Sequence, residues 1–388
     1  MSGAHTLLIA RDFPPDVGGV QTVLDQLARR WPGHLTVIAG EESGAATHDA
    51  AYPRPIHRIR RFDAWPRPIA LLLRQLAVLA TVIRLSRREK FDRVLCGYIA
   101  FAGPTAWLWS RATGRPYVVL TYGNDLLRLD KSPARAVWRR LLTDAQVVST
   151  IADIFTDYVR RFAPGAKPVK IPMGCIFERA DAPPLPEPFH GVPLTGKRVL
   201  LSVGRLVTRK GHDMALRALP ILRTTYDDLV YVIVGDGPDR ARLESLADEL
   251  RVSDMVVFAG RASARELAAL YAAASVFVMP SRQIGEDVEG FGLVFLEAGY
   301  HRVPVVGGNS GGIPEAVREG ENGLLADPTD PTDIAAKVAR LLDDPALASR
   351  MGDAGRRLAT EHFTFAAHGG DVGRGGGGIR VMEVGLSS

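Results

Sequence analysis

The segment Ala182-Pro-Pro-Leu-Pro-Glu-Pro188, followed by Arg198-Val-Leu-Leu-Ser-Val203, decides how the 388-residue chain is organised. The proline-rich part can continue neither a helix nor a sheet, because proline lacks a backbone N–H and its ring fixes φ. The apolar run that follows is typical of a buried strand. We therefore interpret residues 182–197 as a linker between two domains, and the chain length suits two cores of roughly 150–200 residues each.

Both halves of the chain alternate short β-branched runs with amphipathic stretches. The expected strands are Thr6–Ala10, Leu35–Ala39, Arg93–Cys96, Tyr117–Thr121, Gln146–Thr150, Arg198–Val203, Leu229–Val234, Met255–Phe258, Val276–Met279, Val303–Val306 and Gly323–Ala326. This alternation predicts parallel sheets covered by helices. We predict an α/β protein with two Rossmann-like domains, residues 1–181 and 198–365, facing each other across a cleft that is the default ligand site.

Composition and charge limit the cellular compartments and the binding partners to be expected. The two cysteines, Cys96 and Cys175, cannot form a disulfide framework and lack metal-ligand spacing, so we expect a reducing cytosol. Between Arg54 and Lys90 basic residues far outnumber acidic ones. That excess would attract an anionic surface or substrate, or it is the solvated face of an ordinary domain. The basic residues are not interleaved with aromatics, so nucleic acid is not an expected partner.

The longest apolar run is Ile69–Leu85, which Arg74, Gln75 and Arg84 interrupt. We predict that it is too short and too charged to span a bilayer. The mixture of aliphatic residues and arginines in Pro68–Arg88 resembles an interfacial helix lying on anionic lipid. The alternative is a buried Rossmann helix with a basic rim.

The segment Asp12-Phe-Pro-Pro-Asp-Val-Gly-Gly19 lies between the first strand and a helix expected to begin near Val20. Gly18 and Gly19 let the backbone approach a ligand closely, and a helix N-terminus offers free N–H groups to an anion. The spacing matches neither a Walker loop nor a dinucleotide fingerprint. A phosphate-binding turn and a plain tight turn both remain open.

The segment Gly204-Arg-Leu-Val-Thr-Arg-Lys-Gly211 follows the first strand of the second domain. Arg205 and Lys210 therefore stand at the carboxyl edge of a parallel sheet, where open α/β folds bind ligands. An arginine can grip a diphosphate with two hydrogen bonds, and a lysine can neutralise it as a point charge. We favour a diphosphate site over a solvated basic loop.

The segment Glu289-Gly-Phe-Gly-Leu-Val-Phe-Leu-Glu297 carries two carboxylates eight residues apart. The first would lie in a flexible loop and the second in the second turn of a helix that begins near Leu293. Two buried acids beside glycine backbone can accept hydrogen bonds from sugar and ribose hydroxyls. A helix cap and a surface charge would be the ordinary explanation for a lone pair of this kind.

With these motifs in order, the chain resembles the retaining GT-B glycosyltransferases of family four, whose E-x7-E pair matches Glu289 and Glu297. The resemblance runs from the first strand to about Phe365. Its other motifs are Gly18-Gly19, Arg205 with Lys210, 234–238, 258–260 and 309–315. The sequence of residues 279–290 and 309–312 looks especially like that of actinobacterial phosphatidylinositol mannoside mannosyltransferases.

The resemblance implies a GT-B fold and transfer of a hexose from a GDP- or UDP-linked donor to a hydroxyl acceptor, with retention of configuration and without metal or cofactor. Arg205 and Lys210 would hold the diphosphate, Glu297 the ribose hydroxyls, and Glu289 the transferred sugar. Arg261 would meet the base. The donor-binding residues implied in this way are Gly18, Gly19, Gly204, Arg205, Lys210, Gly260, Arg261, Gly290, Phe291, Gly292, Leu293 and Glu297.

The chain departs from the family pattern in three places. Tyr122 stands where the family often has a histidine beside the reacting carbon, and Asp125 could substitute in part; both count as catalytic candidates with Glu289, Arg205 and Lys210. The segment Ile171-Pro-Met-Gly-Cys-Ile176 replaces the usual I-P-N-G-V-D. A glycine-rich tail, residues 366–388, replaces a terminal helix, and is either a divergent end or a reading-frame artefact.

The acceptor and the exact activity stay open at this point. A phospholipid or polyprenyl-linked acceptor would place the protein in the cytoplasm at the inner face of the plasma membrane, in contact with anionic lipid. A small natural-product acceptor is the rival. A sugar-nucleotide 2-epimerase and a catalytically silent GT-B subunit are further alternatives. The sequence selects neither the sugar nor the base.

Overall fold

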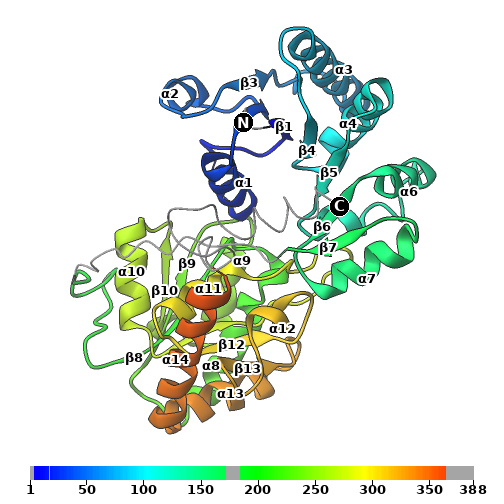
Figure 1. Cartoon of the computed structure of the whole chain (residues 1–388). Coiled ribbons are helices and arrows are strands. Elements are labelled where there is room, and N and C mark those ends of the chain that lie inside the picture. Colours follow the sequence, from blue (N-terminus) through cyan, green and yellow to red (C-terminus); the bar gives the residue numbers. More distant parts are fainter. Residues whose placement is uncertain (1–3, 17, 172–183, 364–388) are drawn as a thin grey trace. The chain divides into compact units, whose positions relative to one another are not determined.

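The computed structural model describes residues 4–16, 18–171 and 184–363. These residues divide into two compact units, one within residues 1–174 and one within residues 175–364, called unit 1 and unit 2 below. Figure 1 colours unit 1 from blue to green and unit 2 from green to red. The segment 172–176, the start of the predicted linker and the tail 366–388 lie outside the described residues, so the predictions about them stay predictions.

Unit 1 is built on a seven-stranded parallel sheet in the order β3-β2-β1-β4-β5-β6-β7. Its strands are β1 (His5–Ala10), β2 (His34–Gly40), β3 (Ile56–Ile59), β4 (Arg93–Cys96), β5 (Tyr117–Leu120), β6 (Val147–Thr150) and β7 (Pro168–Lys170). Its helices are α1 (Gly19–Arg30), α2 (Ala45–Ala50), α3 (Arg67–Ser86), α4 (Ile99–Thr113), α5 (Asn124–Leu127), α6 (Arg135–Asp144) and α7 (Asp153–Phe162).

Unit 2 is built on a six-stranded parallel sheet in the order β10-β9-β8-β11-β12-β13. Its strands are β8 (Arg198–Val203), β9 (Leu229–Val234), β10 (Val256–Gly260), β11 (Val276–Met279), β12 (Val305–Gly308) and β13 (Gly323–Ala326). Its α-helices are α8 (His212–Arg223), α9 (Arg240–Glu249), α10 (Ala264–Ala273), α11 (Leu293–Tyr300), α12 (Ile313–Ala316), α13 (Pro331–Asp343) and α14 (Pro345–His362), and its 3₁₀ turns are η1 (Thr208–Lys210) and η2 (Ser253–Met255).

The predicted α/β class and the two parallel sheets are confirmed, and each predicted strand ends within two residues of the observed one. The central strands are apolar throughout because helices cover both of their faces. Leu7, Leu8 and Ile9 of β1, for example, are 0% exposed. Strands β3 and β7 escaped prediction; they are the outer strands of the first sheet and are short and partly exposed.

In each sheet the strand order reverses at the first strand of the unit, β1 or β8. The loops that leave the two strands flanking such a reversal run to opposite sides of the sheet, and ligands of open α/β folds bind in the crevice between them. In unit 1 these are β1 and β4, and in unit 2 they are β8 and β11. Candidate site residues should therefore lie on the loops at these carboxyl ends.

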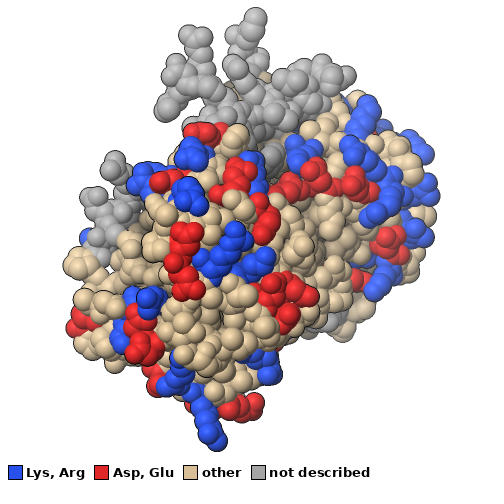
Figure 2. Space-filling view, turned by 90° about the horizontal axis from the view of Figure 1, so that it is seen from below, with Lys and Arg blue, Asp and Glu red and all other residues tan. Residues whose placement is uncertain are grey.

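The basic excess between Arg54 and Lys90 is partly structural. Arg54 donates to the carbonyls of Trp31 and Gly33, and Arg61 pairs with Glu42. Arg54 and Arg61 thus hold loops of unit 1 in place, and Arg61 stays exposed to solvent. On the face shown in Figure 2, basic groups lie beside acidic ones over much of the surface.

Helix α3 corrects one expectation. The segment Pro68–Ser86 is long and apolar enough, by length and composition alone, to cross a membrane, so the prediction that it is too short and too charged was wrong. The helix extends past both ends of the apolar run, which adds length without adding acidic residues. Only 22% of this segment is buried inside the structure. The alternative of a buried Rossmann helix is therefore not what the structure shows.

Candidate active site

The loop after β1 carries Asp12, Gly18 and the start of α1 at Gly19. Among the described residues, no side chain caps α1 and no acidic residue lies in its first turn, so its first backbone N–H groups suit an anion. Gly18 is extended, with φ 178°, and a Cβ there would lie 2.4 Å from Oε1 of Gln21, which is a flexible side chain. The arrangement suits a phosphate, although the backbone conformation at Gly18 does not itself demand glycine.

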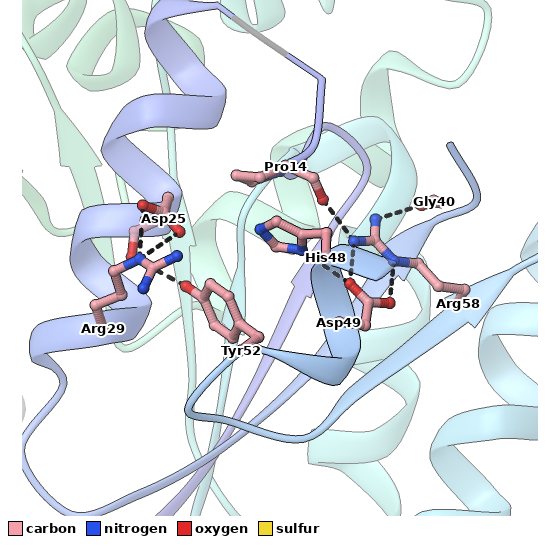
Figure 3. A network of polar contacts seen from close by, with 8 residues as sticks. All are labelled: Pro14, Asp25, Arg29, Gly40, His48, Asp49, Tyr52 and Arg58. Carbon is pink, nitrogen blue, oxygen red and sulfur yellow. Dashed lines mark hydrogen bonds and ion pairs between the residues drawn. The ribbon is translucent and has the colours of Figure 1, made fainter. Parts of the chain in front are cut away.

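Arg58 fixes the loop after β1 from below (Figure 3). Its Nη2 donates to the carbonyl of Pro14 at 2.5 Å and its Nη1 to the carbonyl of Gly40 at 2.8 Å. The same guanidinium pairs with both carboxylate oxygens of Asp49 on α2, at 2.7 and 2.8 Å. Burial would raise the pKa of Asp49, but the bonds from Arg58 and His48 hold it below its usual value. One arginine thus ties together the ends of β1, β2 and the short helix α2.

Tyr122 and Asp125 lie together after β5. The backbone N–H of Tyr122 donates to Oδ1 of Asp125 at 2.9 Å. Within the described residues, Oδ2 of Asp125 and the hydroxyl of Tyr122 have no hydrogen-bond partner although both are buried. Burial raises the pKa of Asp125 to about 6, against the lowering effect of the backbone N–H groups around it. Two unsatisfied polar groups at the carboxyl edge of the sheet are what a hydroxyl-rich ligand would satisfy.

Gly123 explains why this turn is sharp. Its φ is +104°, and a Cβ there would lie 2.5 Å from the ring of Phe155 on α7. Any larger residue would push the turn away from that ring. The glycine therefore keeps Tyr122 and Asp125 at the sheet edge.

The loop after β8 carries Arg205 and Lys210 in different environments. Lys210 ends the 3₁₀ turn η1 and is 8% exposed, whereas Arg205 is exposed. In the part of the chain that the structure describes, no carboxylate pairs with the Arg205 guanidinium. The following residue, Gly211, has φ +75°, and a Cβ there would lie 2.0 Å from the carbonyl oxygen of Pro280. Glycine is required because the loops after β8 and β11 touch at that point.

Glu289 receives two cations on one oxygen. Its Oε2 lies 2.6 Å from Nζ of Lys210 and 2.5 Å from Nη1 of Arg209. The side chain is 11% exposed. Burial would raise the pKa of Glu289, but the charges of Lys210 and Arg209 outweigh it and hold the pKa below its usual value. Glu289 is therefore a fixed anion near neutral pH.

The backbone around Glu289 is held by a second glycine loop. The N–H of Gly312 donates to the carbonyl of Glu289 at 3.0 Å. Gly311 has φ +60°, and a Cβ there would lie 2.5 Å from that same carbonyl. Gly292, with φ +84°, precedes Leu293 at the start of α11. The Asn309–Glu315 motif thus positions Glu289 and does so through backbone contact.

Glu297 lies on α11 in a different environment. The hydroxyl of Tyr271, on α10, donates to its Oε2 at 3.1 Å. Burial raises the pKa of Glu297, and the Tyr271 hydroxyl and the charge of Lys210 oppose that rise. The ring of Tyr271 stacks on His301, with centroids 5.1 Å apart and planes 8° apart. Glu297 is thus a carboxylate with one oxygen engaged by a neutral donor.

The structure places Lys210 in contact with Glu289, and the charge of Lys210 also acts on Glu297; the donor roles given to these residues stay predictions. Gly260 ends β10 with φ +67°, and Arg261 after it is exposed, so a contact with a base stays a prediction. The sequence did not single out two residues that contact the two carboxylates: Arg209 contacts Glu289, and Tyr271 contacts Glu297. Arg209 adjoins Lys210, and the double cation before Gly211 could have indicated it. Tyr271 had no sequence signal, because only the fold places it beside Glu297.

Family models match both units of the chain. Residues 18–174 match the family model described as glycosyl transferase 4-like domain, and residues 188–358 match that described as glycosyl transferases group 1. The GDP-mannose-dependent alpha-(1-6)-phosphatidylinositol monomannoside mannosyltransferase of Mycolicibacterium smegmatis is 36% identical, over 94% of this chain and 96% of that protein. The GDP-mannose-dependent monoacylated alpha-(1-6)-phosphatidylinositol monomannoside mannosyltransferase of Corynebacterium glutamicum is 32% identical, over 94% and 95%.

A solved structure shows the same fold. Sucrose-phosphate synthase from Thermosynechococcus elongatus superposes with a TM-score of 0.77 at 22% identity, over 99% of this chain and 98% of that chain. The two parallel Rossmann-like sheets of this chain are the GT-B fold. The chain belongs to the GT-B glycosyltransferases of family four, enzymes that move a hexose from a nucleotide sugar to an acceptor.

Proposed function

We propose that this chain transfers mannose from GDP-mannose to a phosphatidylinositol mannoside, with retention of anomeric configuration and without a metal ion. The observation that carries the proposal is the contact of Lys210 with Glu289 at the carboxyl edge of the unit 2 sheet. It joins a diphosphate-binding cation to a sugar-binding carboxylate. Relatives that match this chain over nearly their whole length are named for this donor and this acceptor.

In unit 2, different residues would bind different parts of the donor. Arg205, exposed and without a carboxylate partner in the described residues, and Lys210 would hold the diphosphate. Glu289 would accept hydrogen bonds from the hydroxyls of mannose, and Glu297 from those of ribose. Each hydrogen bond to an ionised group contributes about 1.5–3 kcal/mol, so the two carboxylates and the two cations would all contribute to polar recognition of the donor.

The reaction breaks the bond between the sugar C1 and the diphosphate oxygen and forms a bond from C1 to the acceptor oxygen. The acceptor proton passes to a diphosphate oxygen on the same face, and GDP leaves. Arg205 and Lys210 stabilise the negative charge that develops on the departing diphosphate, which is the contribution a metal ion makes in other transferases. In unit 1, Tyr122 and Asp125 carry buried polar atoms without a hydrogen-bond partner among the described residues, and they are the catalytic candidates of that unit.

The test is a transfer assay on purified protein with GDP-mannose, UDP-glucose and UDP-GlcNAc, each offered phosphatidylinositol monomannoside or a small aminocyclitol. We expect mannosylated lipid from GDP-mannose alone, an α-linkage by NMR, and full activity in EDTA. Transfer only to the small acceptor would contradict the lipid part of the proposal. Release of an epimerised nucleotide sugar, or nucleotide binding without any turnover, would contradict transfer itself.

We propose in addition that α3 rests on the cytoplasmic surface of an anionic membrane, which would bring unit 1 to a lipid acceptor. The helix exposes an apolar stripe at helical spacing: Ile69 is 43%, Leu72 60%, Leu76 52% and Ile83 45% exposed. Arg84, Arg87 and Arg88 follow at its end and are exposed. An apolar face with a basic border is what binds anionic lipid surfaces.

Flotation of the protein with vesicles tests this contact. We expect flotation with vesicles containing phosphatidylinositol or phosphatidylglycerol, and much less with pure phosphatidylcholine. Leu72→Ser with Leu76→Ser should abolish it. Val137→Ser on α6 is the matched control, because Val137 is 52% exposed but isolated from that stripe. Equal flotation of the double variant and the wild type would exclude α3 as the contact.

A further inference from the structure

Arg209 bridges two carboxylates beside the proposed donor site. Its Nη1 lies 2.5 Å from Oε2 of Glu289 and its Nε lies 3.1 Å from Oδ1 of Asp287. Its own carbonyl accepts the backbone N–H of Arg282 at 2.8 Å. The Arg209 side chain is 21% exposed. Arg209 is thus fixed through both its side chain and its backbone.

Lys210 contacts the same oxygen of Glu289 but is held differently. A lysine ammonium is a compact charge on a flexible stem, and it can turn towards a new anion. Among the described residues, Glu289 is the carboxylate that pairs with Lys210. A diphosphate that binds at Lys210 would draw this charge away from Glu289. Arg209 cannot follow, because its planar guanidinium is also tied to Asp287.

We propose that Arg209 is a positioning residue that keeps Glu289 ionised and oriented while Lys210 serves the donor diphosphate. This inference rests on the donor roles proposed above for Lys210 and Glu289. The two adjacent cations then have different roles. Lys210 contacts the nucleotide part of the donor, and Arg209 acts on the sugar part through Glu289.

The charged groups that face Glu289 are Arg209 and Lys210. Arg209 also pairs with Asp287, and the charge of Lys210 also acts on Glu297. Burial would raise the pKa of Glu289, and the two cations prevent it. Without Arg209, the cation that remains beside Glu289 among the described residues is the one that the diphosphate attracts. Protonation of Glu289 in the donor complex should then occur at higher pH.

The first experiment compares Arg209→Gln and Arg209→Lys with the wild type. Donor kinetics are measured from pH 5 to 8, and GDP affinity by calorimetry. We expect Arg209→Gln to lower kcat by about 10–100-fold, to change GDP affinity by less than about 3-fold, and to move the acid limb of kcat to higher pH. Arg209→Lys should recover part of kcat because it restores the charge. Equal losses in both variants, a parallel loss of GDP affinity, or an unmoved acid limb would overturn the proposal.

The second experiment does not depend on transfer. A double-mutant cycle of Arg209→Gln and Glu289→Gln is measured by urea unfolding at pH 7. We expect the double variant to lose clearly less stability than the two single losses combined, because each single change strands the partner's charge. Arg282→Gln combined with Glu289→Gln is the control and should be additive, since Arg282 pairs with Asp213. Additive effects in the Arg209 cycle would refute the coupling. If no donor is turned over by the wild type, the proposed function fails while this cycle still decides the role of Arg209.

Discussion

Glu289 and Glu297 are the same residue type eight positions apart, yet the protein surrounds them in opposite ways. Glu289 has two cations on one oxygen, and its pKa is lowered in spite of burial. Glu297 has one tyrosine hydroxyl, and burial raises its pKa. The first is a permanent anion and the second is a hydrogen-bond acceptor that can take up a proton. The difference teaches that the motif spacing fixes the place of each carboxylate, whereas distant segments decide its charge.

The largest expected effect is that of Glu289→Gln, which removes the charge that distinguishes Glu289 from Glu297. We expect kcat to fall on the order of 10²–10³-fold, because a preorganised charge at the transferred sugar is lost. GDP affinity should be kept or increased, since Lys210 no longer has a carboxylate partner in the described residues. Steady-state kinetics and calorimetry with GDP measure both effects.

The control for Glu289→Gln is Asp144→Asn on α6. Asp144 accepts bonds from Trp107, Arg111 and Arg140, so its replacement should lower stability and leave kcat near that of the wild type. A Glu289→Gln enzyme with nearly normal kcat would remove Glu289 from the catalytic site. Lost GDP affinity in that variant would instead place Glu289 at the nucleotide.

Glu297→Gln should produce the next largest effect, on binding and not on turnover. We expect GDP and UDP affinities to fall by about 10-fold, because a charged acceptor of ribose hydroxyls becomes a neutral one. At saturating donor, kcat should change much less. Glu266→Gln is the control, since glutamine can keep the capping box that Glu266 forms with Ser263 on α10. Unchanged nucleotide affinity in Glu297→Gln would exclude the ribose contact.

Much of this arrangement could be predicted from the sequence because it is local. The β-branched runs marked the buried strands, and the two carboxylates and the cations Arg205 and Lys210 stood out by residue type and by position after a strand. Edge strand β3 gave no such signal, since Ile56-His-Arg-Ile59 is half polar where one side of the strand meets solvent. Helix α4 gives a weak sequence signal for the opposite reason: it is largely buried, so it shows little amphipathic contrast, and Pro104 lies inside it.

The contacts that decide the chemistry could not be predicted, because they join distant segments. Arg209 and Glu289 are 80 residues apart in sequence, and Tyr271 and Glu297 are 26 apart. Each pair forms only when neighbouring strands bring their loops or helices together. The same holds for Arg58, whose role as the support of the β1 loop depends on Asp49, Gly40 and Pro14.

The pH dependence of stability should distinguish the two carboxylates by sign. Glu289 has a folded pKa below its ordinary 4.5, so its contribution is present above about pH 4.5 and is lost as the pH falls through the lowered value. Glu297 has a raised folded pKa, so its contribution is present below about pH 4.5 and is lost as the pH rises through the raised value. Relative to wild type, Glu289→Gln should lose stability as the pH rises from below the lowered pKa of Glu289 to about 4.5, and Glu297→Gln should gain stability as the pH rises from about 4.5 through the raised pKa of Glu297.

Urea unfolding of the three proteins at several pH values measures these slopes. The wild type is its own reference at each pH, so a general acid effect on the fold cancels. Slopes of the same sign in both variants would contradict the environments described for the two carboxylates.

The smallest expected effect is that of Tyr271→Phe, which removes one hydroxyl and leaves the ring stacked on His301. GDP affinity should fall by about 2–5-fold at pH 7.5, the range of a single neutral hydrogen bond. The hydroxyl lowers the pKa of Glu297, so its removal raises that pKa further, and the loss of affinity should be larger at pH 5.5. Tyr226→Phe is the matched control, because its hydroxyl donates to Asp343 at 2.7 Å, away from both carboxylates. A loss in Tyr271→Phe that did not depend on pH would mean that the hydroxyl orients Glu297 without governing its protonation, and the contrast with Glu289 would then rest on burial alone.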